Sequence, residues 1–448
     1  MGPLNALTEK LTSLLSQESI DGIARQAGFL QRKSKLTPLA FVKMVLIDHL
    51  LCDQPSLQQH SYGIQSDHGK KITKQGIDNR FNAHAVDFLQ YVFQQYFENQ
   101  LPLHQLPTAL SYKFTSIRVM DSTEFILPES LSHVFPGFSG AGTKACAQIQ
   151  FEYDVLSERV NHMSIENARV SDKTYASERL ATLRKGDLVL RDLGYYSVSS
   201  YAEIESQKAF YISRLKPQVK IYEKKGKSFK ELTHGGILKR LRAKGKMYLD
   251  IPAYIGKDTK HPVRLIANLL DGKAVAHRVK RVKHRKTKLN KADKIDSQLN
   301  LFVTNVPADY CTADELYQLY KIRWQVELIF KTWKSVLKID KVRKMKADRL
   351  KCYLISKLLW VMLSWEVCHV HKKAIWGNHK RLISPYKCFS LLKLQASAIK
   401  VILFSSAQQI KQWLKSLYGC FVDHGLKEDR KGHIGLIELL RFDTGKVA

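Results

Sequence analysis

Four polar residues in the segment YKIRWQVELIFKTWK are spaced so that their side chains could act together. Tyr320, Arg323, Glu327 and Lys334 follow one another at steps of three, four and seven. At about 100° per residue, an α-helix would hold all four within an arc of roughly 60°. The opposite side would carry an apolar stripe made of Leu319, Ile322, Val326, Ile329 and Trp333. The segment therefore predicts a helix with a buried back and a front that mixes a carboxylate, two cations and a phenol.

The same spacing has a simpler explanation. A solvated helix face with one Arg323–Glu327 pair at (i, i+4) spacing would show it too, and such pairs are common and contribute little. The segment therefore indicates chemistry only if other acidic residues of the chain can join Glu327.

Two aspartates follow apolar runs that are typical of strands. Asp121 stands in RVMDSTEF, and Asp192 stands in LVLRDLGYY, two residues before Gly194, where the backbone can turn sharply. Taken alone, each aspartate could equally cap a turn or a helix. Three converging carboxylates would suffice to hold two divalent cations about 3.5–4 Å apart, which can activate water and stabilise the leaving oxygen in phosphodiester cleavage.

The elements that would position these residues follow from hydrophobic patterning. The patterns predict strands over 114–120, 145–156, 159–170, 188–192, 209–215 and 299–307, with helices over 174–184 and 198–207. Three consecutive strands followed by alternating helices and strands predict a mixed α/β sheet. This order puts Asp121 at the end of the first strand and Asp192 at the end of the fourth.

Composition divides the chain into five predicted parts. They are a helical N-terminal DNA-binding region, the first part of an α/β catalytic core, a lysine-rich and largely β insertion, the second part of the core, and a helical C-terminal region, over 1–105, 106–215, 216–299, 300–375 and 376–448. Within the first part, a helix that begins near Thr73 could be the reading helix of a helix-turn-helix. A bundle of solvated helices explains that segment at least as well.

The densest run of basic residues is RVKRVKHRKTKLNK, over 278–291, which holds eight lysines and arginines and no acid. A solvated charged loop is one explanation, but this density favours contact with phosphate backbones. The predicted contacts are Arg278, Lys280, Arg281, Lys283, Arg285 and Lys286. Lys144, in GAGTKACAQ, is a further candidate, although a plain surface lysine explains it equally well.

The overall charge favours a polyanionic partner. The chain of 448 residues has 72 lysines and arginines against 41 acidic residues, a formal charge of +31. Nucleic acid is the partner that such a charge fits best. The seven cysteines stand singly, without metal-site or disulfide-frame spacing, and indicate a reduced cytoplasmic protein. The N-terminus lacks the pattern of a secretory signal, and the apolar segment from Tyr353 is interrupted by Lys357 and Glu366, so we expect a core helix and no membrane partner.

These residues together resemble a known family. The order Asp121, Asp192, basic segment and Glu327 is similar to that of bacterial insertion-sequence transposases with an aspartate–aspartate–glutamate triad, specifically the insertion-sequence-four group that includes the transposases of transposons five and ten. That group is marked by Tyr, two residues, Arg, three residues, Glu, six residues, Lys, and the segment quoted first matches every spacing. Asp-Arg-Gly-Tyr is commoner in the group than the Asp-Leu-Gly-Tyr found here, so an auxiliary arginine is in doubt at Leu193.

The resemblance implies a ribonuclease-H-like core, a bacterial cytoplasmic enzyme and a set of roles. Asp121, Asp192 and Glu327 would hold two Mg²⁺ ions, with Mn²⁺ able to take their place, and would cleave and rejoin DNA at the inverted ends of the element, through a hairpin. Arg323 and Lys334 would neutralise phosphates beside the cut, Tyr320 would hold a phosphate or displaced nucleotide, and Trp324 could stack on a base, whereas Trp333 would be core. Family members act as dimers on DNA.

Two rival functions stay open. One is a metal-dependent nuclease of the same fold that cuts without joining, which would have no need of the full Tyr320, Arg323 and Lys334 face. The other is a transposase-derived DNA-binding regulator without catalysis, which the three intact carboxylates disfavour.

Overall fold

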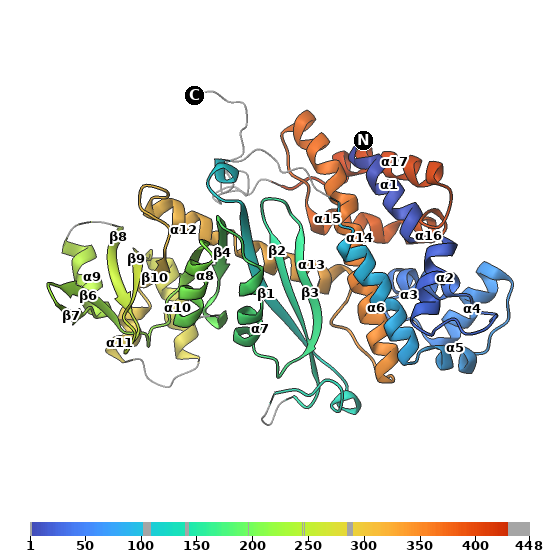
Figure 1. The fold of residues 1–448 in the computed structure, drawn as a ribbon, viewed down its shortest axis with the longest axis horizontal. Helices are drawn as coiled ribbons and strands as arrows, with labels where there is room; N and C mark the ends of the chain where they lie inside the picture. Colours follow the sequence, from blue (N-terminus) through green and yellow to red (C-terminus); the bar gives the residue numbers. More distant parts are fainter. Residues whose placement is uncertain are drawn as a thin grey trace.

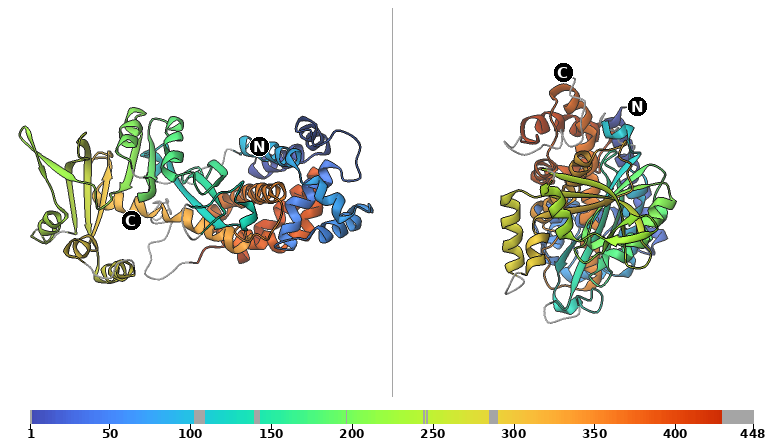
Figure 2. Two further views of the ribbon diagram at one scale, coloured as in Figure 1. Left: turned by 90° about the horizontal axis from the view of Figure 1, so that it is seen from below. Right: turned by 90° about the vertical axis from the view of Figure 1, so that its left-hand side faces the viewer.

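The computed structural model describes residues 2–101, 109–138, 143–195, 197–243, 245, 247–284 and 290–428. Three regions follow one another along the longest axis of the molecule (Figure 1). A region of strands and short helices lies at one end, the strands β1 to β3 lie in the middle, and a helical region lies at the other end. Two further views show the same succession (Figure 2).

A single mixed sheet runs through the first two regions. Its ten strands lie in the order β3-β2-β1-β4-β5-β10-β9-β8-β6-β7. Their bounds are β1 Ser116–Ile126, β2 Cys146–Asp154, β3 Val160–Asn167, β4 Asp187–Arg191, β5 Phe210–Arg214, β6 Ile221–Lys225, β7 Ser228–Glu231, β8 Tyr248–Ile255, β9 His261–Leu269 and β10 Leu299–Thr304. The predicted mixed α/β architecture is confirmed.

The pairing of the first five strands fixes the predicted site. β1 is antiparallel to β2 and parallel to β4, and β4 is parallel to β5. One prediction was wrong here: β1 does not end at Asp121 but continues to Ile126. The reason is that every residue from Arg118 to Ile126 pairs with β2, with Asp121 opposite Phe151. β4 ends at Arg191, so Asp192 follows the fourth strand as predicted.

The lysine-rich segment extends the same sheet instead of forming one of its own. β10 is antiparallel to both β5 and β9, which joins the two parts. The segment also carries helices α9 His234–Ala243, α10 Gly272–Lys283 and α11 Lys291–Asp296. The prediction that this segment is largely β was therefore wrong. The buried apolar residues of this segment form one cluster with those of β5 and α8. In that cluster the rings of Tyr201 and Tyr211 stack with centroids 4.2 Å apart.

Helices cover both faces of the central strands. α13 packs against Phe151 through Trp333, with ring centroids 5.0 Å apart, whereas Tyr175 of α7 clusters with Met120 on the other face. The helices and short 3₁₀ turns of this part are η1 Ala109–Tyr112, η2 Glu129–Leu131, α7 Asp172–Glu178, η3 Leu180–Thr182, η4 Leu193–Tyr195, α8 Val198–Ser206, α12 Ala313–Lys321 and α13 Trp324–Val336. Alternation of apolar residues along β1 and β2 supplies each face with its own packing surface.

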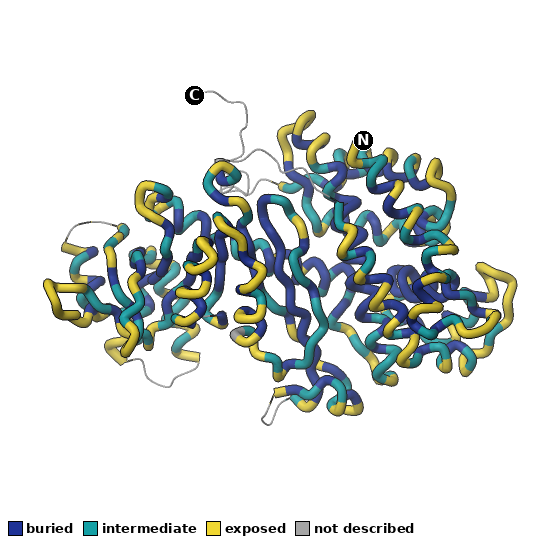
Figure 3. Tube along the Cα trace, viewed as in Figure 1, coloured by how far each residue is buried: buried dark blue, intermediate teal, exposed yellow. Residues whose placement is uncertain are grey.

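The helical region combines the two ends of the described chain. Its helices are α1 Pro3–Leu14, α2 Gln17–Gln26, α3 Pro38–Leu51, α4 Leu57–His68, α5 Lys74–Arg80, α6 Ala83–Glu98, α14 Ala347–His379, α15 Pro385–Leu394, α16 Ala396–Ile402 and α17 Ala407–His424. α14 contains the apolar segment from Tyr353 and is a buried core helix, as predicted (Figure 3). Among the described helices, none has the length and apolar character needed to cross a membrane.

One buried carboxylate in this region has several partners. The Glu366 carboxylate of α14 accepts hydrogen bonds from Lys10 Nζ at 2.7 Å, from the Tyr96 hydroxyl at 2.7 Å and from the Leu101 amide at 2.9 Å. A buried charge is tolerated when its lone pairs are satisfied in this way. The contact ties α1 and α6 to α14.

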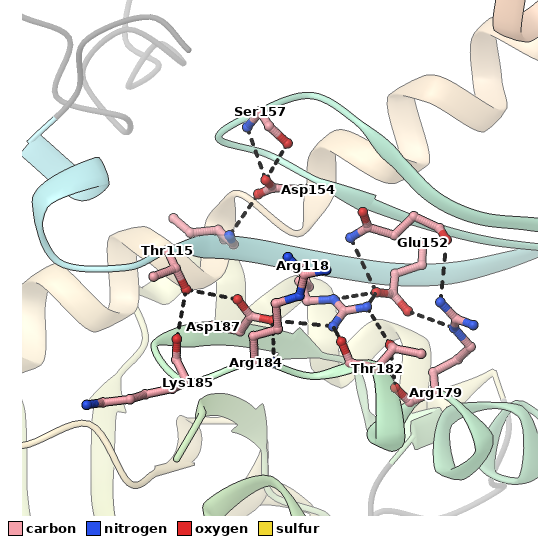
Figure 4. A network of polar contacts seen from close by, with 12 residues as sticks. Thr115, Arg118, Glu152, Asp154, Ser157, Arg179, Thr182, Arg184, Lys185 and Asp187 are labelled. Atoms are coloured by element: carbon pink, nitrogen blue, oxygen red, sulfur yellow. Dashed lines mark hydrogen bonds and ion pairs between the residues drawn. The ribbon is translucent and has the colours of Figure 1, made fainter. Parts of the chain in front are cut away.

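A second buried network ties the central strands together (Figure 4). Arg118 Nε of β1 donates to Glu152 Oε1 of β2 at 2.6 Å, and Arg118 Nη1 donates to the Thr182 carbonyl at 2.9 Å and reaches Asp187 Oδ2 of β4 at 3.4 Å. Since Arg118 lies three residues before Asp121, this network fixes the strands that position the aspartate.

The β2–β3 turn is fastened to the helical region. Glu158, at the left-handed φ of 56°, pairs through its carboxylate with His369 and Lys372 of α14, and Trp365 Nε1 donates to its carbonyl at 2.8 Å. Burial by itself would raise the pKa of Glu158, but the contacts with His369 and Lys372 hold that pKa at about 2. This clamp joins the central strands to α14.

We predict that Glu158→Gln destabilises the protein by about 3 kcal/mol at pH 7, the value that corresponds to a pKa lowered from 4.5 to about 2. Because the pKa of the folded state lies below that of the unfolded state, the stabilisation is complete above pH 4.5 and fades as pH falls toward 2. Urea denaturation at pH 7, 5 and 4 should show a gap between wild type and variant that narrows below pH 4.5.

The matched control is Glu203→Gln, which removes the same charge from an exposed position of α8. It should leave the unfolding free energy within about 0.5 kcal/mol of wild type. Equal effects of the two substitutions would contradict the clamp.

Candidate active site

The predicted aspartates come together through strand register. The parallel pairing of β1 with β4 runs from Ser116 opposite Asp187 to Val119 opposite Leu190. Continuing this register by two residues sets Asp121 opposite Asp192, just beyond the last paired residue of β4. Because neighbouring strands lie about 4.8 Å apart, the two carboxylates start from adjacent backbone positions.

The spacing predicted that Tyr320 and Glu327 lie on one helix, but the structure has two helices here. α12 ends at Lys321 and α13 begins at Trp324, and Ile322 and Arg323 form a turn between them. The Arg323 amide bonds to the Tyr320 carbonyl at 3.1 Å and the Gln325 amide bonds to the Ile322 carbonyl at 2.9 Å. These three-residue bonds belong to a tighter 3₁₀ turn, which interrupts the regular spacing of four.

The apolar back of this segment is confirmed. Leu319, Ile322, Val326, Ile329 and Trp333 are all buried. Trp333 also packs against Phe330, with ring centroids 5.3 Å apart, and is a core residue as predicted. The buried stripe therefore continues across the turn between the two helices. Its packing places the polar side of the segment next to β1 and β4.

Arg323 joins two of the three carboxylates. Its Nη2 atom lies 2.7 Å from Glu327 Oε1, and its Nη1 atom lies 3.4 Å from Asp121 Oδ2. The side chain is only 11% exposed, so both contacts are largely shielded from water. Burial by itself would lower the pKa of Arg323, but the charges of Asp192, Tyr320, Glu327 and Asp121 raise it above its ordinary value.

Tyr320 reaches the third carboxylate. Its hydroxyl lies 3.4 Å from Asp192 Oδ1 and 3.3 Å from the Arg191 carbonyl. Burial, followed by the charge of Asp192, raises the pKa of Tyr320, so the phenol stays protonated and donates. Asp121, Asp192 and Glu327 thus lie around one arginine and one tyrosine.

The carboxylates influence each other's charge. The pKa of Asp121 is raised to about 6, mainly by burial and to a smaller extent by the charges of Asp192 and Glu327. The Ser122 amide, 2.9 Å from Asp121 Oδ1, and the charge of Arg323 oppose this shift without cancelling it. An added cation would relieve the repulsion that these three groups share.

The donor set fits a hard divalent cation. All three groups offer carboxylate oxygens, the ligands that Mg²⁺ and Mn²⁺ take, and they leave room for water and phosphate. Among the described residues, no three His, Cys, Asp or Glu side chains form a ready-made metal cluster. The guanidinium of Arg323 lies between Asp121 and Glu327 and contacts both.

The rest of the predicted front is partly exposed. Lys334 Nζ donates to the Glu124 carbonyl of β1 at 3.0 Å. Trp324, the first residue of α13, is 55% exposed, and Leu328, one turn later, is 40% exposed. Trp324 and Leu328 therefore form an accessible apolar strip on α13, next to Glu327.

The other predicted DNA contacts differ in accessibility. Lys280, Arg281 and Lys283 are exposed on α10, whereas Arg278 turns inward to donate to the Leu299 carbonyl at 2.7 Å. Burial lowers the pKa of Arg278 to about 10. Lys144 forms an exposed pair with Glu129 at the β1–β2 connection. Arg285 and Lys286 lie outside the described residues.

Sequence reasoning missed two polar residues that lie close to the site, with side chains on the opposite face of the sheet. Arg191 is buried beside Asp192, and its Nη2 atom donates to the Ala176 carbonyl at 3.2 Å. Asp172 of α7 accepts from Gln148 Nε2 at 3.0 Å and from Gln150 Nε2 at 3.1 Å, on the face of β2 away from α13. An arginine that ends the apolar run LVLR was a readable signal for the first, whereas nothing local indicates the second.

Comparison with known proteins shows the family of the chain. The family model described as "Transposase DDE domain" matches residues 112–363, which include Asp121, Asp192 and Glu327. The chain is 30% identical over 450 residues to the transposase for insertion sequence element IS231E of Bacillus thuringiensis subsp. finitimus, covering 96% of this chain and 93% of that one. It is 26% identical to the transposase for IS1151 of Clostridium perfringens, covering 99% and 98%.

The family match spans more than half of the chain, and the similarity to these relatives runs nearly from end to end. The chain therefore belongs to the family of transposases with a DDE domain.

Proposed function

We propose that this chain is the transposase of an insertion sequence, that it cleaves DNA at the inverted ends of its element and that it joins the freed 3′ hydroxyls to target DNA. The observation that carries the proposal is the gathering of Asp121, Asp192 and Glu327 around Arg323 within the matched DDE domain. The spacing from Tyr320 to Lys334 further supports membership in the insertion-sequence-four group.

The fold supports a ribonuclease-H-like core. The strand order β3-β2-β1-β4-β5, with β1 parallel to β4, is what we expect of such a core. The core would comprise 106–215 and 300–375, with 216–299 as an insertion between β5 and β10. Residues 1–105 would bind DNA and 376–448 would support the helical region.

The chemistry assigned to the site is hydrolysis and transesterification of phosphodiesters. Asp121, Asp192 and Glu327 would hold two Mg²⁺ ions, which Mn²⁺ could replace. When bound, these ions supply electrophilic stabilisation of phosphate oxygens and favour deprotonation of the attacking hydroxyl. A hairpin at the cleaved end would require the neighbouring base to leave the duplex stack.

The chain's own residues would orient the DNA. Arg323 and Lys334 place positive charge on the side of α13 that faces β1, where a phosphate beside the cut would lie. The buried Tyr320 hydroxyl donates toward the Asp192 side of the same site. Trp324 is exposed at the rim and would stack on a displaced base. Lys280, Arg281 and Lys283 would follow the backbone farther along the duplex, with Lys144 as a weaker candidate.

Two ends must be cut and joined together, so we propose that the chain acts as a homodimer on DNA in the bacterial cytoplasm. The formal charge of +31 supports long-range attraction to the DNA.

The first test is Glu327→Gln. Loss of a carboxylate ligand should lower both nicking and joining of an end-bearing duplex by more than about 100-fold, because even changes in the outer shell of a metal site can cost that much. Binding to the duplex, followed by fluorescence anisotropy, should change less than about twofold, since the basic surfaces remain. Glu178→Gln on the exposed surface of α7 is the control, and it should cut at the wild-type rate.

Joining separates a transposase from a nuclease. We expect wild-type protein with Mg²⁺ to transfer a pre-cut end, with a free 3′ hydroxyl, into a supercoiled plasmid, and sequencing of the junctions would count the products. A protein that nicks intact ends but gives no junctions would be the nuclease. Binding without either reaction would indicate the inactive regulator.

The basic helix α10 gives a salt-dependence prediction. Replacing Lys280, Arg281 and Lys283 together by glutamine should flatten the slope of log Kd against log salt by about 2–3, since each phosphate contact contributes about 0.9. The matched control exchanges the three residues conservatively, lysine for arginine and arginine for lysine, and should keep the slope. An unchanged slope in the glutamine variant would remove α10 from the DNA interface.

A further inference from the structure

Arg323 occupies the place where its own site would bind metal. It comes from the turn between α12 and α13, and its guanidinium lies between Asp121 on β1 and Glu327 one turn into α13. The contacts are 3.4 Å and 2.7 Å. One positive charge therefore already partly neutralises two of the three proposed metal ligands.

The same guanidinium retains capacity for another acceptor. Its Nε atom is buried and has no hydrogen-bond partner among the described residues. An arginine has five N–H donors in a fixed fork, and a phosphate accepts two of them side by side. A phosphate that bonds Nε and one Nη atom would therefore use the donor that the two carboxylates leave without a partner.

The two occupants of the carboxylates exclude each other. A guanidinium and a divalent cation use the same oxygens, and two like charges held within a few ångströms repel each other strongly in a partly shielded site. Displacing Arg323 would remove the positive charge that Asp121 and Glu327 now contact and would leave three acidic groups close together. The carboxylates then need a replacement cation.

On these grounds, and resting on the proposed function, we propose that Arg323 is an internal counter-cation that competes with metal for Asp121 and Glu327 until a DNA phosphate takes its guanidinium. Metal loading is thereby coupled to DNA binding. By linkage the coupling is reciprocal: DNA raises the affinity for metal by the same factor by which metal raises the affinity for DNA. A transposase built this way holds little metal when no DNA is present.

The test measures binding of Mn²⁺ to the purified full chain by the electron paramagnetic resonance signal of the free ion, so it needs no catalysis. Without DNA, Arg323→Gln should bind Mn²⁺ at least about tenfold more tightly than wild type, the size of effect that a neighbouring charge has on a carboxylate. Arg323→Lys keeps a charge and should stay within about threefold of wild type. Lys331→Gln removes a charge from an exposed position of the same helix and should change nothing.

A second arm repeats the measurement in the presence of DNA. Adding an end-derived duplex should raise the affinity of wild type for Mn²⁺ by about tenfold or more, after subtraction of the ions bound by the same duplex with Glu327→Gln. The gain should be much smaller in Arg323→Gln, where the competitor is already gone. Circular dichroism melts would confirm that each variant is folded.

The outcomes distinguish the two proposals. If Glu327→Gln weakens Mn²⁺ binding but Arg323→Gln does not strengthen it, Arg323 is no competitor and the further inference is overturned while the metal site stands. If Glu327→Gln leaves the affinity for Mn²⁺ unchanged, both in wild type and in Arg323→Gln, the carboxylates are not the metal ligands. Both proposals are then overturned.

Discussion

Repulsion among three carboxylates is the constraint on which the site depends. At a separation of roughly 4 Å and an effective dielectric constant of about 20, two such charges repel by about 4 kcal/mol. The fold must therefore bring Asp121, Asp192 and Glu327 together against their own charge. It does so with two independent devices, the parallel register of β1 and β4 for the aspartates and the packing of α13 for the glutamate. Arg323 and the Tyr320 hydroxyl supply the compensation.

The surrounding structure resists that repulsion through rigid, buried contacts. Arg118 locks β1, β2 and β4 together three residues from Asp121, and Trp333 seats α13 on Phe151 of β2. The Glu158 clamp then fastens the β2–β3 turn to α14, so the strands cannot tilt independently of the helical region. Each of these contacts would be ordinary in another protein. Here they keep like charges within reach of a single cation.

The sequence predicted the site better than it predicted the elements that carry it. The two aspartates were singled out as polar residues that follow apolar runs, and Tyr320, Arg323 and Glu327 by their helical spacing, and the structure brings these five residues close together. The break at Ile322 was not predictable, since both halves keep the same buried stripe and only three-residue backbone bonds reveal it. The extension of β1 to Ile126 depends on its pairing with β2, which is a tertiary contact.

The basic segment shows the same limit from another side. Eight lysines and arginines in a row of fourteen residues carry one electrostatic signal, yet their side chains serve different ends. Arg278 points inward and holds the Leu299 carbonyl of β10, whereas Lys280, Arg281 and Lys283 point outward from α10. Helical periodicity separates Lys280 and Lys283 from Arg278, because residues two and five positions later leave the helix on its far side. Charge density thus predicts where a polyanion will approach, and only the fold decides which cations are free to meet it.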